Sequence, residues 1–150
     1  MSTKVTLSAM DIAAYFIELA SAINENDLTN LKLQKLLYFA QGKYLAKNNT
    51  PLFKEDIEAW LLGPVVRNVY EEYKSCGAFP ITTFDKGYKN TKNIPEEIKN
   101  FLKDIWKEYG IFSASYLVDL THRSKSAWYK ISKEKGDYSI IPKELLKNSF

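Results

Sequence analysis

The chain has 150 residues, of which 45% are hydrophobic and 14% aromatic, so it can bury one substantial core and is expected to form a single domain over residues 1–150. Its net charge of +3, from 21 basic and 18 acidic residues, is too nearly balanced to indicate a nucleic-acid partner. One cysteine and one histidine exclude a disulfide framework and a structural zinc site, and no segment approaches the ~20 apolar residues of a membrane span. We therefore expect a cytoplasmic protein without membrane association.

Two amphipathic helices are predicted at the start of the chain. Ser8 and Asp11 have the spacing of a capping box and predict a helix over residues 8–24. Residues 29–30 offer a second N-cap, Thr or Asn, for a helix with a wide apolar stripe. That helix should stop before residues 48–51, where two asparagines and a threonine precede a proline.

The middle of the chain is expected to be less regular. Residues 53–62 keep no clean apolar period, and the following Gly63 and Pro64 predict a turn in which Pro64 takes the first position of a short helix. Gly77 should end that helix in a left-handed conformation. Residues 78–93 mix β-prone residues with turn formers and predict either a short hairpin or an irregular loop.

Helical patterns return after this segment. Pro95 opens the clearest helix of the chain, whose apolar residues face one side until Gly110. Ser113 can cap a further helix, and a short one follows over residues 127–133. The predicted fold class is therefore mainly α: a compact multi-helix domain whose one candidate β element is a small hairpin around residues 78–93.

The sequence lacks the motifs of common catalytic sites. Cys76 and His122 are the only residues that could form a thiol–imidazole pair, but Cys76 beside a helix-ending glycine fits a small half-buried apolar residue better. The acidic residues are spaced like ordinary surface charges, and the chain has no phosphate-binding glycine loop, dinucleotide fingerprint or His-x-x-x-His motif. We expect no enzyme activity, no cofactor and no metal.

Several motifs, taken together and in order, resemble a known family. The longest is the run Leu-Thr-Asn-Leu-Lys-Leu-Gln-Lys-Leu-Leu-Tyr-Phe-Ala-Gln at residues 28–41. It is followed by Leu-Phe at 52–53, Ile-Glu-Ala-Trp at 57–60 and Gly-Pro-Val-Val at 63–66. This series resembles the SocA-like, GepA-type domain, also called the Panacea antitoxin domain, and the similarity extends over residues 11–128.

The resemblance implies a mostly helical, phage-associated protein that neutralises a cognate protein toxin by binding it directly. One branch of the family also delivers its toxin to an AAA+ protease, which makes such a protease a further candidate partner. The chain departs from the family pattern at Arg67 and Ala127, where proline is common. The family-motif residues, with structural or partner-binding roles, are Leu33, Gln34, Lys35, Tyr38, Glu58, Trp60, Gly63, Pro64, Val65, Thr121, His122 and Trp128.

These motif residues have two interpretations, because they can either fix the fold or contact the toxin. In the first case a polar network would be formed by Lys35, Glu58, Arg67 and His122. We favour the first, since surfaces that select one partner are expected where a promiscuous family varies rather than in its signature. The toxin would then bind the two irregular segments described above.

A second function class is a nucleic-acid-binding phage accessory protein. Residues 1–75 hold 8 basic and 9 acidic residues, a net charge of −1, whereas residues 76–150 hold 13 and 9, a net charge of +4. Lys130, Lys133 and Lys135 contribute to this surplus next to aromatic residues that could stack on bases. Because acidic residues interrupt the lysines, a solvated helix face is the better interpretation, and the sequence favours a toxin over nucleic acid. A hydrolase ranks third, since no nucleophile or metal set is assembled.

Overall fold

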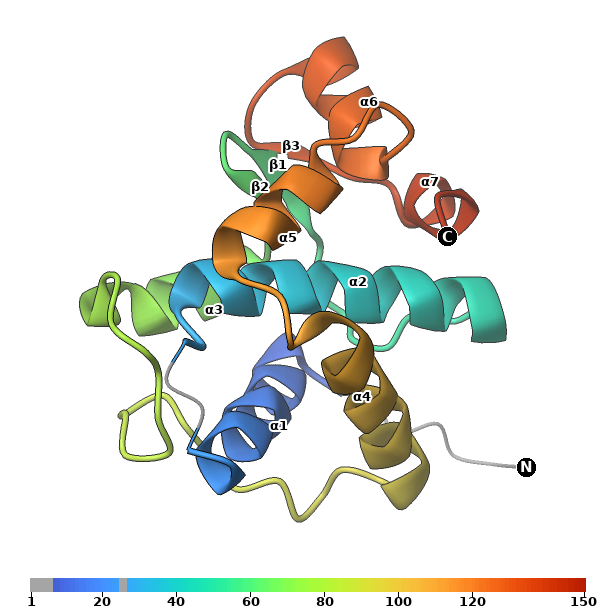
Figure 1. The fold of residues 1–150 in the computed structure, drawn as a ribbon. Helices are drawn as coiled ribbons and strands as arrows, with labels where there is room; N and C mark the ends of the chain where they lie inside the picture. Colours follow the sequence, from blue (N-terminus) through green and yellow to red (C-terminus); the bar gives the residue numbers. More distant parts are fainter. Residues whose placement is uncertain (1–6, 25–26) are drawn as a thin grey trace.

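Helices dominate the computed structural model, which describes residues 7–24 and 27–150 and confirms the mainly α fold class. The elements are α1 (Ala9–Ala22), α2 (Asn30–Asn48), β1 (Glu58–Trp60), β2 (Gly63–Val65), α3 (Arg67–Tyr73), the 3₁₀ helix η1 (Lys74–Cys76), α4 (Glu96–Tyr109), α5 (Ala114–Thr121), α6 (Ala127–Lys135), β3 (Ser139–Ile140) and α7 (Lys143–Asn148). α2 crosses the middle of the molecule, with α1 and α4 on one side and the sheet, α5, α6 and α7 on the other (Figure 1). None of these helices is long and apolar enough to cross a membrane.

The helix ends follow the local signals in the sequence. The Ser8 hydroxyl accepts a hydrogen bond from the Asp11 N–H (3.1 Å) and the Asp11 carboxylate accepts one from the Ser8 N–H (3.0 Å), which confirms the capping box. Thr29 and Ser113 cap α2 and α5 through their side-chain oxygens. α2 ends where Asn49 takes a left-handed conformation with a φ of 58°.

Two predictions for the middle of the chain need correction. Pro64 does not open a helix: it lies in β2, and α3 begins only at Arg67. The hairpin option for residues 78–93 is wrong and the irregular loop is confirmed, because this segment contains turns and no strand. Its β-prone Phe79 and Phe84 are 78% and 96% exposed, so they have no sheet to pack against.

The small hairpin of this fold is formed by β1 and β2. Trp60 pairs with Gly63 across the two-residue turn Leu61–Leu62. β3 adds a third antiparallel strand from far along the chain by pairing Glu58 with Ile140, so the strand order is β2-β1-β3. Strands of two or three residues do not form a stable sheet alone, and this one therefore depends on the helices that pack against it.

α2 is buried on nearly all sides. Four of its polar side chains are at most 1% exposed: Lys32, Gln34, Lys35 and Gln41. Buried polar groups need hydrogen-bond partners, which these find on neighbouring segments. The Lys32 ammonium donates to the Gly110 carbonyl (2.7 Å), and the Gln41 amide donates to the Phe53 carbonyl (2.9 Å) and accepts from the Leu52 N–H (2.7 Å). α2 thus fixes the chain at several distant points.

The two departures from the family pattern have a common structural explanation. Arg67 and Ala127 are the first residues of α3 and α6. Proline is favoured at the first helical position because the N–H there has no partner within the helix, but other residues fit it too. At that position Arg67 uses its side chain for an ion pair with Glu58 (2.7 Å).

Candidate functional site

The β1–β2 hairpin is attached to α2 through two buried side chains. The Gln34 carbonyl oxygen accepts a hydrogen bond from the Val66 N–H (2.9 Å), and the Lys35 ammonium donates to the Pro64 carbonyl (3.0 Å). Gln34 is itself oriented by donating its amide to Asn30 (2.9 Å). The motif in α2 and the Gly-Pro-Val-Val motif are therefore in direct contact, although about thirty residues separate them in the sequence.

Lys35 lies in the most crowded part of this contact. Its side chain is fully buried, and burial lowers its pKa from 10.5 to about 7. Gly63 passes over it with a φ of +114°, and a Cβ there would lie 2.7 Å from Lys35 Cε and 2.9 Å from Thr121 Oγ1. Thr121 in turn donates to the Val118 carbonyl (2.7 Å). Glycine is needed at position 63 for both its conformation and its lack of a side chain.

α5 and α6 hold the other side of the hairpin. The Trp128 indole N–H donates to the Trp60 carbonyl (2.8 Å), and the His122 ring stacks on Trp128 with centroids 3.9 Å apart. Burial, and then the nearby Lys35, lower the pKa of His122, whose Nε2 is buried without a hydrogen-bond partner. Tyr38 is likewise buried, which raises its pKa to about 12, and its hydroxyl has no hydrogen bond of good geometry. The lowered pKa favours the neutral form of the His122 imidazole.

The outer face of the hairpin is aromatic. The half-buried Trp60 donates its indole N–H to Glu58 (2.9 Å), and the Arg67 guanidinium lies over its ring, 5.1 Å from the centroid. Tyr70 and Tyr138 pack edge-on against Trp60 with centroids 4.9 and 5.2 Å away. Burial raises the pKa of Glu58, but Arg67 and Trp60 outweigh that effect and hold it below its usual value.

A groove of about 490 Å³ lies beside this face and is called the hairpin groove below. It is lined by Asn30, Leu31, Gln34, Lys35, Trp60, Leu61, Leu62, Val65, Tyr70, Lys74, Gly77 and Tyr138. Three of its large apolar residues are strongly exposed: Leu61 by 73%, Leu62 by 57% and Tyr138 by 60%. An exposed apolar surface around a concave site is typical of binding surfaces.

The structure brings most of the motif residues together around the hairpin. Leu33 is an exception, because it is a fully buried core residue of α2. The proposed polar network is divided into two groups: Glu58 pairs with Arg67, whereas Lys35 lies near His122. Asn30, Tyr70 and Tyr138 also line the hairpin groove, although the set of motif residues does not include them. Asn30 lies within the run at residues 28–41, but the sequence did not indicate that the three residues share one site, because tertiary contacts bring them together.

The groups considered for catalysis lie in unsuitable surroundings. The Cys76 thiol donates to an Asp85 carboxylate oxygen (3.4 Å), and burial and this carboxylate raise its pKa, which disfavours the reactive thiolate. His122 is occupied by stacking on Trp128. Within residues 7–24 and 27–150, no three His, Cys, Asp or Glu side chains form a group that could hold a metal ion.

Comparisons with known proteins agree on one family. Residues 33–129 match the family model described as "Antitoxin SocA-like, Panacea domain". The chain is 30% identical over 143 residues to a protein named Antitoxin SocA from Caulobacter vibrioides (strain NA1000 / CB15N), in a match that covers 87% of this chain and 73% of that protein. No solved structure matches the chain.

The crowding at Gly63 predicts that Gly63→Ala destabilises the fold. The positive φ alone costs an L-residue about 1 to 3 kcal/mol, and the new methyl group must also displace Lys35 or Thr121. Gly136→Ala is the control, because Gly136 has a φ of +87° but nothing within 4 Å of the added Cβ. Urea unfolding should show a larger loss for Gly63→Ala than for Gly136→Ala. Equal losses would mean that the contact with Lys35 and Thr121 is not tight.

The buried Lys35 predicts a specific pH dependence of stability. Its pKa is about 7 in the fold and 10.5 when exposed, so unfolding takes up a proton between these values and rising pH stabilises the fold. From about pH 7 to pH 9, the free energy of unfolding should rise relative to Lys35→Met by up to about 1.4 kcal/mol per pH unit. Urea titrations of both proteins measure the difference. Parallel pH profiles would show that Lys35 keeps an ordinary pKa in the fold.

Proposed function

We propose that this chain, which belongs to the antitoxin SocA-like, Panacea domain family, binds a cognate protein toxin in the cytoplasm and neutralises it. The observation that carries the proposal is the similarity to Antitoxin SocA, which covers 87% of this chain. The match to the family model over residues 33–129 also supports it.

The state of the motif residues supports a binding role rather than catalysis. Lys35 is fully buried and its ammonium is directed to the Pro64 carbonyl, while Thr121 donates to Val118. Groups that act on a substrate must reach it, whereas the Lys35 ammonium is already used in fixing the hairpin and the Thr121 hydroxyl in a hydrogen bond within α5. The motif therefore fits a scaffold that presents a surface to another protein.

Co-expression with neighbouring genes tests the proposal. Each small gene adjacent to this one is expressed alone and together with this chain. We expect one of them to arrest growth, and we expect this chain to restore growth and to co-purify with the product. If the toxin level also falls in a strain with active AAA+ proteases but not in a protease-deficient one, the chain acts as a proteolytic adapter as well. The absence of arrest, rescue and co-purification for every neighbour would contradict the proposal.

Nucleic-acid binding is tested by its dependence on salt. Lys130 and Lys133 are exposed on α6, and the Lys133 ammonium lies over the Tyr129 ring, 5.4 Å from its centroid. We expect fluorescence anisotropy to show at most micromolar binding of labelled oligonucleotides at low salt, and its loss near 0.15 M, because a few phosphate contacts do not survive screening at about that ionic strength. Submicromolar binding at that salt, abolished by changing Lys130, Lys133 and Lys135 together to Glu, would make nucleic-acid binding the better assignment.

A further inference from the structure

The hairpin groove carries exposed apolar side chains at a place where the fold does not need them. Leu61 and Leu62 form the turn between β1 and β2, where two-residue hairpin loops usually favour glycine and asparagine. Both are more than half exposed, as is Tyr138, which also lines the groove. The half-buried Trp60 belongs to the lining too, and Tyr138 packs edge-on against it. This surface can accept an apolar side chain from another molecule.

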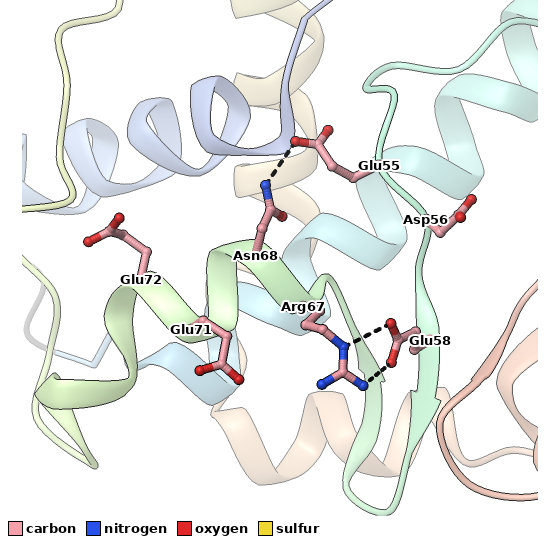
Figure 2. Close-up of a pocket in the computed structure, with 7 residues that line it drawn as sticks. All are labelled: Glu55, Asp56, Glu58, Arg67, Asn68, Glu71 and Glu72. Carbon is pink, nitrogen blue, oxygen red and sulfur yellow. Dashed lines mark hydrogen bonds and ion pairs between the residues drawn. The ribbon is translucent and has the colours of Figure 1, made fainter.

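A second hollow, called the acidic groove below, also uses α3: Arg67, Asn68, Glu71 and Glu72 line it, whereas Tyr70 lines the hairpin groove. Figure 2 shows its lining residues, and its volume is about 710 Å³. They comprise one amide, one guanidinium and five carboxylates: Asn68, Arg67, Glu55, Asp56, Glu58, Glu71 and Glu72. A chain with a net charge of +3 thus gathers five acidic residues around one hollow. The charge of this surface is opposite in sign to that of the whole protein.

The two grooves share their walls. β1 contributes Glu58 to the acidic groove and Trp60 to the hairpin groove, and α3 contributes Arg67 to the first and Tyr70 to the second. Arg67 joins them, because its guanidinium pairs with Glu58 (2.7 Å) and lies over the Trp60 ring (5.1 Å from the centroid). The two grooves therefore adjoin at Arg67.

We propose that the two grooves together form the docking surface for a cationic amphipathic segment of a protein partner. An apolar side chain of that segment enters the hairpin groove between Leu62 and Tyr138, and its lysine or arginine side chains lie over Glu71 and Glu72. The identification of this partner with the toxin rests on the proposed function. Arg67 and Lys143 already pair with Glu58 and Asp56. Charge complementarity still selects a cationic partner, since an acidic one would face the remaining carboxylates, Glu55, Glu71 and Glu72.

Peptides with matched apolar faces test the chemistry of the occupant. The probes are two helical peptides of about 18 residues with leucine on one face and either lysine or glutamate on the other. Fluorescence anisotropy with the full chain should show binding of the lysine peptide and at least about tenfold weaker binding of the glutamate peptide. Equal binding of both peptides, or of neither, would overturn the docking surface.

Variants test the location. Leu62→Asp and the double change Glu71→Lys with Glu72→Lys alter exposed side chains. Each should weaken binding of the lysine peptide by about tenfold or more and leave the melting temperature unchanged. Matched controls are Ile111→Asp, at a residue 76% exposed, and the double change Asp104→Lys with Glu134→Lys at exposed positions of α4 and α6, which alters the charge equally; both should bind as the wild type does. If the controls weaken binding as much as the groove variants do, the peptide binds elsewhere and the proposal fails.

The growth assay separates this proposal from the antitoxin assignment. If the wild type restores growth and Leu62→Asp does not, the antitoxin assignment and the docking surface are both supported. If Leu62→Asp and the double glutamate variant restore growth as well as the wild type does, the toxin docks elsewhere while the antitoxin function stands. If no neighbouring gene product is neutralised but the lysine peptide binds selectively, the docking surface serves another cationic protein and the antitoxin assignment fails.

Discussion

The polar side chains that α2 buries are the constraint on which the rest of the fold depends. A helix enclosed on nearly all sides cannot leave an amide or an ammonium group without a partner, and the irregular segments around it cannot leave their backbone groups unpaired either. Each satisfies the other: Gln34 binds Val66, Lys35 binds Pro64, Gln41 binds Leu52 and Phe53, and Lys32 binds Gly110. The hairpin, the segment before it and the corner after α4 are therefore all placed by the register of one helix. A rotation of α2 by one residue would break these contacts together.

This arrangement explains why the family signature has its two parts. The run at residues 28–41 and the Gly-Pro-Val-Val sequence at 63–66 are the two sides of one contact, and Thr121 and Trp128 close it from α5 and α6. In this chain these residues hold the hairpin on α2, and we expect the same of other members that carry them. The side chains that remain exposed around the contact can differ without loss of the fold, so the choice of partner can change while the signature is kept.

The sequence predicted the structure well where the signals are local and poorly where they are not. The capping box of Ser8 and the N-caps Thr29 and Ser113 depend on neighbours three residues away, and these helix starts are correct. β-propensity made a hairpin one of the two options for residues 78–93, but propensity does not reveal a pairing partner, and β1 needs β2 and the distant β3. The buried roles of Gln34 and Lys35 depend on backbone groups about thirty residues away, which no periodicity reveals. The family resemblance located these residues but not their contacts.

Scaffold and binding surface are physically coupled in this protein. Lys35 donates a hydrogen bond to the Pro64 carbonyl. Pro64 follows Gly63, the residue that ends the turn formed by Leu61 and Leu62. A change at Lys35 or Gly63 would therefore displace the exposed leucines, although both residues are themselves buried. Loss of binding after substitution of a motif residue is then evidence about the fold, and only exposed residues such as Leu62 and Glu71 report on the contact itself. The free energies of binding and of unfolding have to be measured on the same variants, because only then can an effect on the contact be separated from an effect on the fold.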